Sequence, residues 1–153
     1  MGAATIPAAS GGKTRFALTL TSGTSWTVPA GVTYVNVTLQ GGGSGSYGAT
    51  SGNTIPGQPG SMISSTFAVT AGASITYAIG AGGAGGSNSV VPSVGGTTTF
   101  TGATSAPGGL VGGTTQAGAP GTPQGGFNNG ASANASISNV SGGAGRIDVE
   151  YWV

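Results

Sequence analysis

The sequence predicts an all-β fold, and three observations carry this prediction. Several short runs alternate between apolar and polar residues, which is the pattern of half-buried β-strands. Glycine accounts for 34 of the 153 residues and separates these runs. No segment of helical length repeats with a period of 3.6 residues, and glycine is unfavourable in helices. These features favour an antiparallel β-sandwich, jelly-roll-like, with long glycine-rich loops.

The clearest strand is expected at 32–40. Val35, Val37 and Leu39 fall on one face of it, and the residues between them fall on the other. A turn is expected before it at 29–31, because proline fixes φ and glycine accepts a positive φ. The strand then leads directly into three consecutive glycines, and the rest of the chain repeats this order of strand, glycine-rich stretch and strand.

The same alternation predicts the remaining strands. In chain order these are 13–21, a short strand at Trp26 and Val28, 62–70, 74–79, 97–101, 134–140 and 146–153. A short glycine turn at 71–73 joins two of them as a hairpin, and another turn is expected at 142–145. Residues 1–12 are interpreted as an N-terminal arm and residues 13–153 as a single domain.

Strand parity predicts where the long loops lie. Antiparallel strands reverse direction at each connection, which places loops 41–60 and 80–96 at one end and the short turns at the other. Residues 112–133 join the same end if Leu110 and Val111 form a short strand, and fall at the opposite end if they do not. Glycine would let these backbones pack closely as polyproline-II-like segments.

The predicted core is thin for a chain with so much glycine. Its candidates are Phe16, Leu18, Leu20, Trp26, Val28, Val35, Val37, Leu39, Ile63, Phe67, Val69, Ile75, Tyr77, Ile79, Phe100, Ile147, Val149 and Tyr151. Glycine loses more conformational entropy on folding than other residues. Burial against identical neighbours would compensate, so a homo-oligomer is expected.

Charge is nearly absent. Three basic and two acidic residues give a net charge of +1. This excludes the phosphate-tracking patch of a nucleic-acid-binding protein and the polybasic patch of a membrane-surface protein. No apolar run is long enough to span a membrane. Contacts with any partner should therefore depend little on salt.

An enzymatic function is not expected. The chain has no cysteine and no histidine, which removes catalytic triads and most transition-metal sites. Asp148 and Glu150, the only carboxylates, share one face of a strand about 7 Å apart. Such a pair could serve glycoside hydrolysis, but a solvated outer face with Arg146 as partner is the simpler interpretation. No cofactor and no metal are expected.

Two nucleotide-binding motifs match only in part. Residues 80–85 fit G-x-G-x-x-G after a strand, but a dinucleotide site needs a helix next and an acidic residue about 20 positions on. More glycine and serine follow, and the next acidic residue is Asp148. Residues 12–14 resemble the end of a P-loop, but Pro7 stands where its first glycine belongs. Both matches are attributed to composition.

Tyr47 and Phe127 are the candidate contact residues. Each is an aromatic residue inside a glycine-rich loop. An exposed ring there could stack on a sugar or anchor a protein partner. The alternative is that each ring folds back and fills its own loop.

Three segments carry a family resemblance. They read WTVPAGVT and VNVTLQGGG at 26–43, VTAGASITYAIGAGGAGG at 69–86, and GAGRIDVEYWV at 143–153. In this order they resemble the glycine-rich domain of bacteriophage tail-fibre and other virion proteins, over residues 24–153.

The resemblance implies a position on the outside of a phage particle, assembled in the cytoplasm of the host bacterium. It also favours a trimer, because fibrous phage parts commonly close threefold. The short chain fits a structural protein that docks on other virion proteins of capsid or tail, as a decoration or head fibre. The alternative is an adhesin or tail-fibre module whose glycine-rich loops bind a receptor, such as a host surface glycan. The sequence leaves capsid or tail location open.

Overall fold

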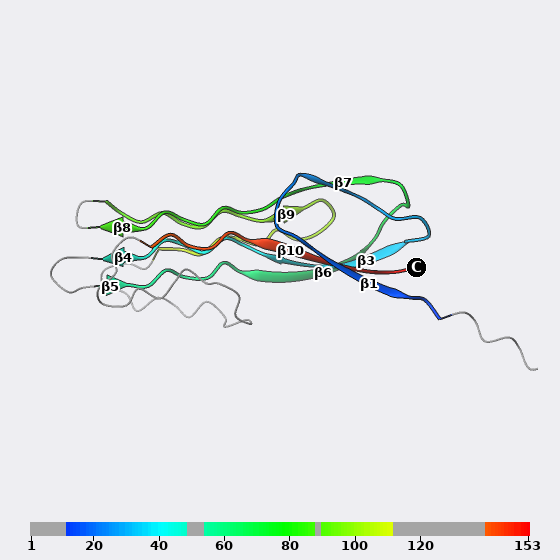
Figure 1. Ribbon diagram of the computed structural model, residues 1–153, viewed down its shortest axis with the longest axis horizontal. Coiled ribbons are helices and arrows are strands. Elements are labelled where there is room, and N and C mark those ends of the chain that lie inside the picture. Colours follow the sequence, from blue (N-terminus) through cyan, green and yellow to red (C-terminus); the bar gives the residue numbers. More distant parts are fainter. Residues whose placement is uncertain (1–11, 49–53, 88–89, 112–139) are drawn as a thin grey trace, which may run out of the picture.

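The computed structural model describes residues 12–48, 54–87, 90–111 and 140–153. The described chain contains strands and no helix, so the predicted all-β class is confirmed. The molecule is elongated, with its larger sheets toward one end and a narrow bundle of extended segments toward the other (Figure 1). The strand order alone establishes neither a sandwich nor a jelly roll.

The largest sheet has four antiparallel strands. Their order is β1 (Arg15–Leu20), β10 (Arg146–Trp152), β3 (Tyr34–Gln40) and β6 (Met62–Ala68). Each neighbouring pair is antiparallel, and β3 and β10 occupy the centre. These four strands match the expected strands at 13–21, 146–153, 32–40 and 62–70 to within two residues at each end.

Two smaller sheets complete the fold. The first joins β2 (Ser25–Thr27), β7 (Ser74–Ala78) and β9 (Thr99–Phe100), all antiparallel. The second joins β5 (Thr54–Ile55), β4 (Tyr47–Gly48) and β8 (Gly86–Ser87), with β4 and β8 parallel. This second small sheet lies at the far end of the molecule (Figure 1), and we call it the tip sheet.

The core lies between the four-stranded sheet and the β2-β7-β9 sheet. Alternate residues of β3 and β10 are fully buried there, as their period of two predicts: Val35, Val37, Leu39, Ile147 and Val149. Phe100 is 2% exposed, and its ring centroid lies 6.2 Å from those of Trp26, Phe67 and Tyr77. Most core candidates are thus buried or pack against this cluster.

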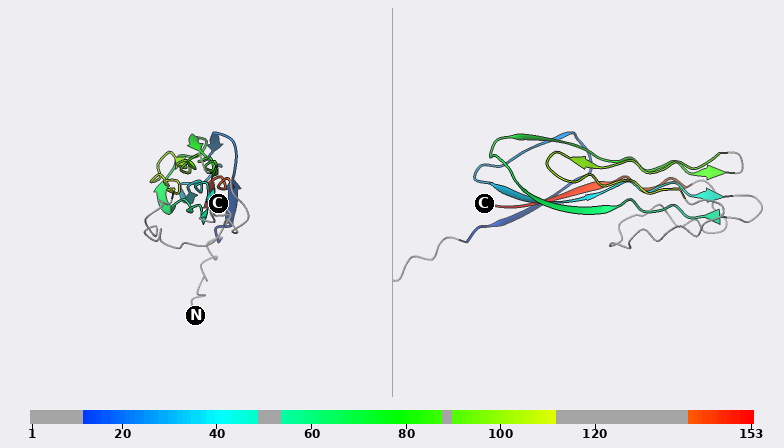
Figure 2. Two further views of the ribbon diagram at one scale, coloured as in Figure 1. Left: turned by 90° about the vertical axis from the view of Figure 1, so that its left-hand side faces the viewer. Right: turned by 180° about the vertical axis from the view of Figure 1, so that it is seen from behind.

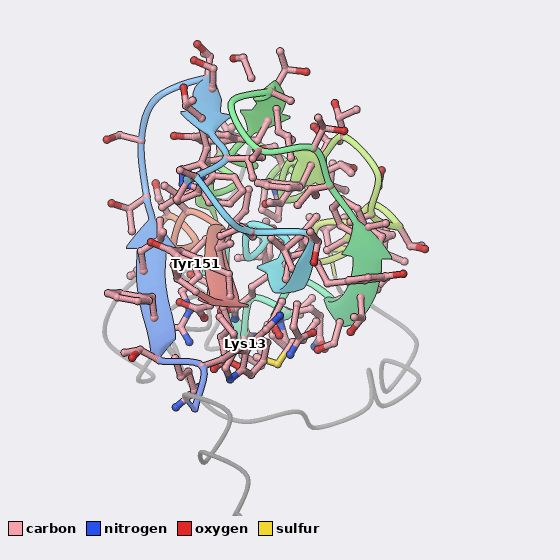
Figure 3. All side chains as sticks on the ribbon, turned by 90° about the vertical axis from the view of Figure 1, so that its right-hand side faces the viewer. Lys13 and Tyr151 are labelled. Carbon is pink, nitrogen blue, oxygen red and sulfur yellow. The ribbon has the colours of Figure 1, made fainter. Side chains whose placement is uncertain are left out.

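Phe16 is the exception among the core candidates. Its side chain is 44% exposed, although its ring stacks on Tyr151, which Figure 3 labels, at 5.4 Å. The reason is its place on β1, a strand at the edge of the sheet with no further strand beyond it among the described residues. Alternation identifies a face of a strand but not the position of that strand in the sheet.

The glycine-rich stretches, expected as long loops with closely packed backbones, form a packed bundle of extended segments. Six such segments of the described chain run side by side away from the large sheet: 41–46, 56–61, 79–86, 92–97, 107–109 and 140–145 (Figures 1 and 2). They exchange backbone hydrogen bonds of 2.7–3.0 Å along their length. The expected turn at 142–145 is therefore wrong, because Gly142 and Gly145 donate to Gly83 and Gly80 within this bundle.

Segment 41–46 lies at the centre of the bundle, and all six of its residues are buried. Its backbone N–H groups donate in turn to three neighbours, and the pattern repeats after three residues. Gly41 and Ser44 donate to Ser61 and Gln58, Gly42 and Gly45 to Gly96 and Ser93, and Gly43 and Ser46 to Gly143 and Val140. A three-residue repeat is that of a polyproline II helix, which agrees with the expectation of such segments.

The ends of the molecule partly follow the predicted parity. The turns near 29–31 and 71–73 lie together, since Val28 and Ala73 share a backbone bond, and Gly31 and Gly72 have φ of 82° and 79°. Within 41–60 and 80–96, strands β4 and β8 share the opposite end, because they pair with each other there (Figure 1). Leu110 and Val111 do not form a strand. The expected strand at 134–140, apart from Val140, and the loop at 112–133 lie outside the described residues.

Candidate functional site

Tyr47 lies at the tip, at the start of β4. Its backbone pairs with Gly86 on one side and Ile55 on the other, and its side chain is half-buried. The Tyr47 ring is therefore neither fully exposed to solvent nor fully packed inside its own loop. Phe127 lies outside the described residues.

Three valines form an exposed apolar group near the tip that the sequence interpretation missed. Val90, Val91 and Val94 are 57%, 79% and 53% exposed. Val90 and Ser87 exchange backbone bonds of 2.9 and 2.8 Å, which holds Val90 beside the tip sheet. Such apolar residues at one end of a molecule are typical of a contact surface. The available signal was three valines within five residues of a glycine- and serine-rich stretch.

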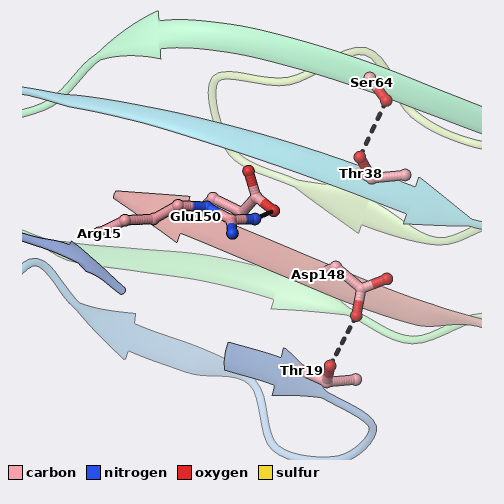
Figure 4. Close-up of polar contacts among 6 residues, drawn as sticks. All are labelled: Arg15, Thr19, Thr38, Ser64, Asp148 and Glu150. Atoms are coloured by element: carbon pink, nitrogen blue, oxygen red, sulfur yellow. Dashed lines mark hydrogen bonds and ion pairs between the residues drawn. The ribbon is translucent and has the colours of Figure 1, made fainter. Parts of the chain in front are cut away.

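The second predicted site, the two carboxylates, lies on the outer face of the four-stranded sheet (Figure 4). Asp148 accepts a hydrogen bond of 2.6 Å from Thr19 Oγ1 and pairs with Arg146 at 3.0 Å. Glu150 pairs with Arg15 on the neighbouring strand. The expected partnership of this face with Arg146 thus holds for Asp148, whereas Glu150 uses a different cation.

The outer face is polar beyond these charges. Thr38 and Ser64 share a hydrogen bond of 2.9 Å across β3 and β6, and Thr66 donates to Asn36 at 3.3 Å. An open hollow of about 600 Å³ lies beside Asp148 and is lined by residues of all four strands. Both carboxylates already hold cationic partners, so this face has the character of a solvated sheet surface.

A buried threonine joins the sheets to the bundle. Thr98 Oγ1 donates to the Gln40 carbonyl at 2.6 Å and accepts from the Gly80 N–H at 3.0 Å, and the residue is fully buried. Gln40 is the last residue of β3, so this hydroxyl serves the point where the central strand becomes the central bundle segment. The position of the tip relative to the large sheet depends on this junction.

The profile of the glycine-rich domain family matches residues 19–149. The chain belongs to this family. The match covers β3, β6, the described bundle segments and the tip sheet, but only the last two residues of β1 and the first four of β10. A comparison with curated proteins gave no match.

The described part of the domain contains no helix that could span a lipid bilayer. Within the same residues, no three His, Cys, Asp or Glu side chains gather in the way a metal site requires.

Proposed function

We propose that this glycine-rich domain is a non-enzymatic structural protein on the exterior of a bacteriophage particle, where it self-associates and docks on capsid or tail. The resemblance of residues 24–153 to virion proteins supports the particle setting. The observation that carries a structural role is the glycine bundle, which separates the compact sheets from an apolar tip (Figure 2).

The bundle has the properties of a stiff spacer. Its central segment of six residues corresponds to about 19 Å of polyproline II helix. A lone polyproline II helix has no hydrogen bonds of its own, but here each N–H of segment 41–46 bonds to a neighbouring segment. Because these hydrogen bonds reach neighbours on three sides of segment 41–46, they oppose bending of the bundle toward any of those sides. A protein that holds one contact surface away from another needs this stiffness.

The broad end suits docking because it carries the largest sheet, whose edge strand β1 exposes Phe16. On a particle, the four-stranded sheet would lie toward other virion proteins and the tip would point outward. The family resemblance favours a homotrimer as the form of self-association, and the twofold pairing argued below is the alternative to it.

The test is to locate the protein on particles. Antibodies against the isolated domain should label purified phage particles that carry its gene, and quantitative mass spectrometry should count the copies. Hundreds of copies would assign a capsid decoration, and a few dozen or fewer a tail component. Absence from purified particles would overturn the proposal, whatever the oligomeric state of the isolated protein.

The exposed valines favour a second candidate, an adhesin that uses the tip. Val90 and Val91 are exposed at the tip, where Val90 pairs with β8, the strand that also pairs with β4 and its half-buried Tyr47. An aromatic ring with adjoining apolar side chains suits contact with the apolar face of a surface glycan or with a protein receptor. The long bundle would then present this group to a host cell.

We expect the double substitution Val90→Asp and Val91→Asp to reduce binding to host cells at least tenfold, because two carboxylates would have to lose water on contact. Flow cytometry with labelled protein measures this. Leu110→Asp is the matched control, since Leu110 is 72% exposed on a bundle segment that bonds near Gly42, away from the tip. Equal binding of the two variants to host cells would exclude the tip as the binding surface.

A further inference from the structure

Strand β1 leaves one side of its backbone without a partner in the described chain. Thr14 and Val153 exchange hydrogen bonds of 2.8 and 3.0 Å just before the strand begins. Bonded pairs alternate along an antiparallel ladder, so the next are Phe16 with Tyr151 and Leu18 with Val149. The N–H and C=O groups of Arg15, Ala17 and Thr19 therefore point away from β10, to the open edge.

Within Arg15–Leu20 this edge lacks the usual protection against pairing, and the exposed Lys13 lies before the strand. Edge strands are commonly blocked by proline, by exposed lysine, by a bulge or by a covering loop. β1 keeps a continuous register with β10 over its full length from Arg15 to Leu20, without a bulge. Its one charged residue, Arg15, is turned to Glu150 on the neighbouring strand.

The opposite edge of the sheet, β6, is better covered. Thr104 donates its N–H to Ser65 Oγ at 3.3 Å, and Gly102 lies so close that an added Cβ would stand 2.5 Å from the Phe67 ring. Loop 102–104 therefore lies over the inner face of β6. Both edges present outward backbone groups, but among the described residues only β1 adds an exposed apolar ring, that of Phe16.

Apolar side chains reach this open edge. Phe16 is 44% exposed, and Leu18 and Leu20 on the same face are half-buried. A partner that added a strand at β1 would extend the sheet and cover Phe16 at once. An added strand thus satisfies two features of β1, its free backbone groups and its exposed ring.

We propose that β1 pairs with β1 of a second copy of this chain, antiparallel about a twofold axis at Ala17. This proposal rests on the self-association that the proposed function includes. Ala17 then faces the partner's Ala17, where two methyl groups create no clash. Phe16 faces the partner's Leu18 in the closer, non-bonded type of pair, about 4.5 Å between Cα atoms. The backbone groups of Arg15, Ala17 and Thr19 find partners in both copies.

The charged side chains near β1 favour a second copy of the chain as its partner. In the same register Arg15 stands opposite the partner's Thr19. Within one chain, Thr19 Oγ1 already bonds to Asp148 at 2.6 Å. Each arginine keeps Glu150 as its own partner and lies on the side of a carboxylate of the other copy rather than opposite a like charge, and the symmetry repeats this arrangement. Like charges directly opposite would destabilise the sheet, whereas this weak additional attraction favours the pairing.

Cysteine crosslinking tests the register directly, because the chain contains no cysteine of its own. The twofold axis places the two Ala17 Cα atoms about 5.5 Å apart, the spacing of a bonded antiparallel pair, within the rough 4.4–6.8 Å range of disulfides. We expect Ala17→Cys to form a disulfide dimer on mild oxidation, in most of the protein. Ala68→Cys is the control, because Ala68 is exposed on the other edge strand.

Proline substitution tests whether the edge bonds hold the dimer. Ala17→Pro removes an N–H that points outward and leaves the β1–β10 ladder intact. We expect at least a tenfold rise in the dimer dissociation constant, measured by sedimentation of the full chain. Ala68→Pro is the matched control on β6, since the Val69 N–H bond to Thr33, 2.8 Å long, places the Ala68 N–H outward too. It should leave the constant unchanged.

Ala17→Lys provides a second disruptive variant that keeps the backbone N–H, should the proline variant lose its near-ultraviolet circular dichroism. It should weaken the dimer because two lysines would face each other across the axis. A monomeric wild-type protein would overturn the pairing, as would a closed trimer, because a twofold interface joins copies in pairs. Equal crosslinking by the Ala17 and Ala68 cysteine variants would do the same. None of these results bears on whether the protein is found on particles.

Discussion

At the scale of single residues, the bundle depends on missing Cβ atoms. A Cβ added to Gly42 would lie 2.1 Å from the carbonyl oxygen of Ala81, and one on Gly45 would lie 1.9 Å from that of Ala84. Real Cβ atoms do not approach carbonyl oxygens so closely, and the obstacle is backbone, which cannot rotate away. Glycine is required here for space rather than for an unusual φ.

We therefore expect Gly42→Ala to destabilise the protein by about 3 kcal/mol, because overpacking a closed interior forces the backbone to shift. Gly12→Ala is the control, since an added Cβ at Gly12 has no neighbour within 4 Å. Urea unfolding followed by fluorescence measures both free energies of unfolding. An equal effect of the two substitutions would mean that the bundle segments are not packed as described.

The junction threonine gives a second prediction at this scale. Thr98→Val keeps the shape of the side chain but removes both hydrogen bonds of its hydroxyl, with the Gln40 carbonyl and the Gly80 N–H. Leaving buried polar groups unsatisfied should cost about 2 kcal/mol. Thr38→Val, on the exposed outer face, should change the free energy of unfolding by less than about 0.5 kcal/mol. Thermal unfolding of the two variants provides the comparison.

At the scale of elements, the strands could be predicted from sequence and the bundle only in part. Alternation such as that of Val35, Val37 and Leu39 reports burial of one face, so each long strand was found. Segments of glycine carry no such pattern, because without a side chain neither face differs from the other. Closely packed polyproline-II-like segments were expected. The partners of segment 41–46, however, are set by backbone hydrogen bonds, which no side-chain pattern in the sequence reports. The same limit explains why 142–145 was taken for a turn.

The candidate site was predicted less well than the strands. Tyr47 is singled out because it is the one large ring in its stretch, and the structure places it at the tip, while its contact role stays a prediction. Val90 and Val91 were missed because a few apolar side chains in a glycine-rich segment are as consistent with packing inside a loop as with an exposed contact surface. Their exposure becomes evident only when the tip is placed at the end of a bundle that gives them nothing to pack against.

Hydrogen exchange should reveal the bundle as a stable element despite its lack of regular secondary structure. The amides of segment 41–46 are buried, and each donates to a neighbouring segment. We expect them to exchange as slowly as amides of the central strand β3, because both open only when the core opens. Mass spectrometry of overlapping peptides measures this. Exchange of 41–46 at the rate of an unstructured peptide would contradict the bundle.

At the scale of the whole molecule, polarity is divided in an unusual way. Four of the five charged side chains, Arg15, Arg146, Asp148 and Glu150, lie on or beside the outer face of one sheet and pair with one another. The fifth, Lys13, is exposed just before β1 (Figure 3). The bundle and the tip are neutral over their described residues, so their surface is hydrated by backbone and hydroxyl groups. Long-range electrostatics can therefore contribute little to recognition at the tip.

This division predicts the salt dependence of association. A surface ion pair contributes at most about 1 kcal/mol, which corresponds to about a fivefold change in a dissociation constant. Added salt screens such pairs but leaves backbone hydrogen bonds and apolar contacts in place. We expect self-association of the isolated protein to change less than about fivefold between roughly 50 and 500 mM NaCl, a range over which the Debye length falls severalfold. Sedimentation at matched protein concentrations measures the constant. A loss of a hundredfold or more would require several new ion pairs between copies, and five charges that are mostly paired within one chain could not supply them.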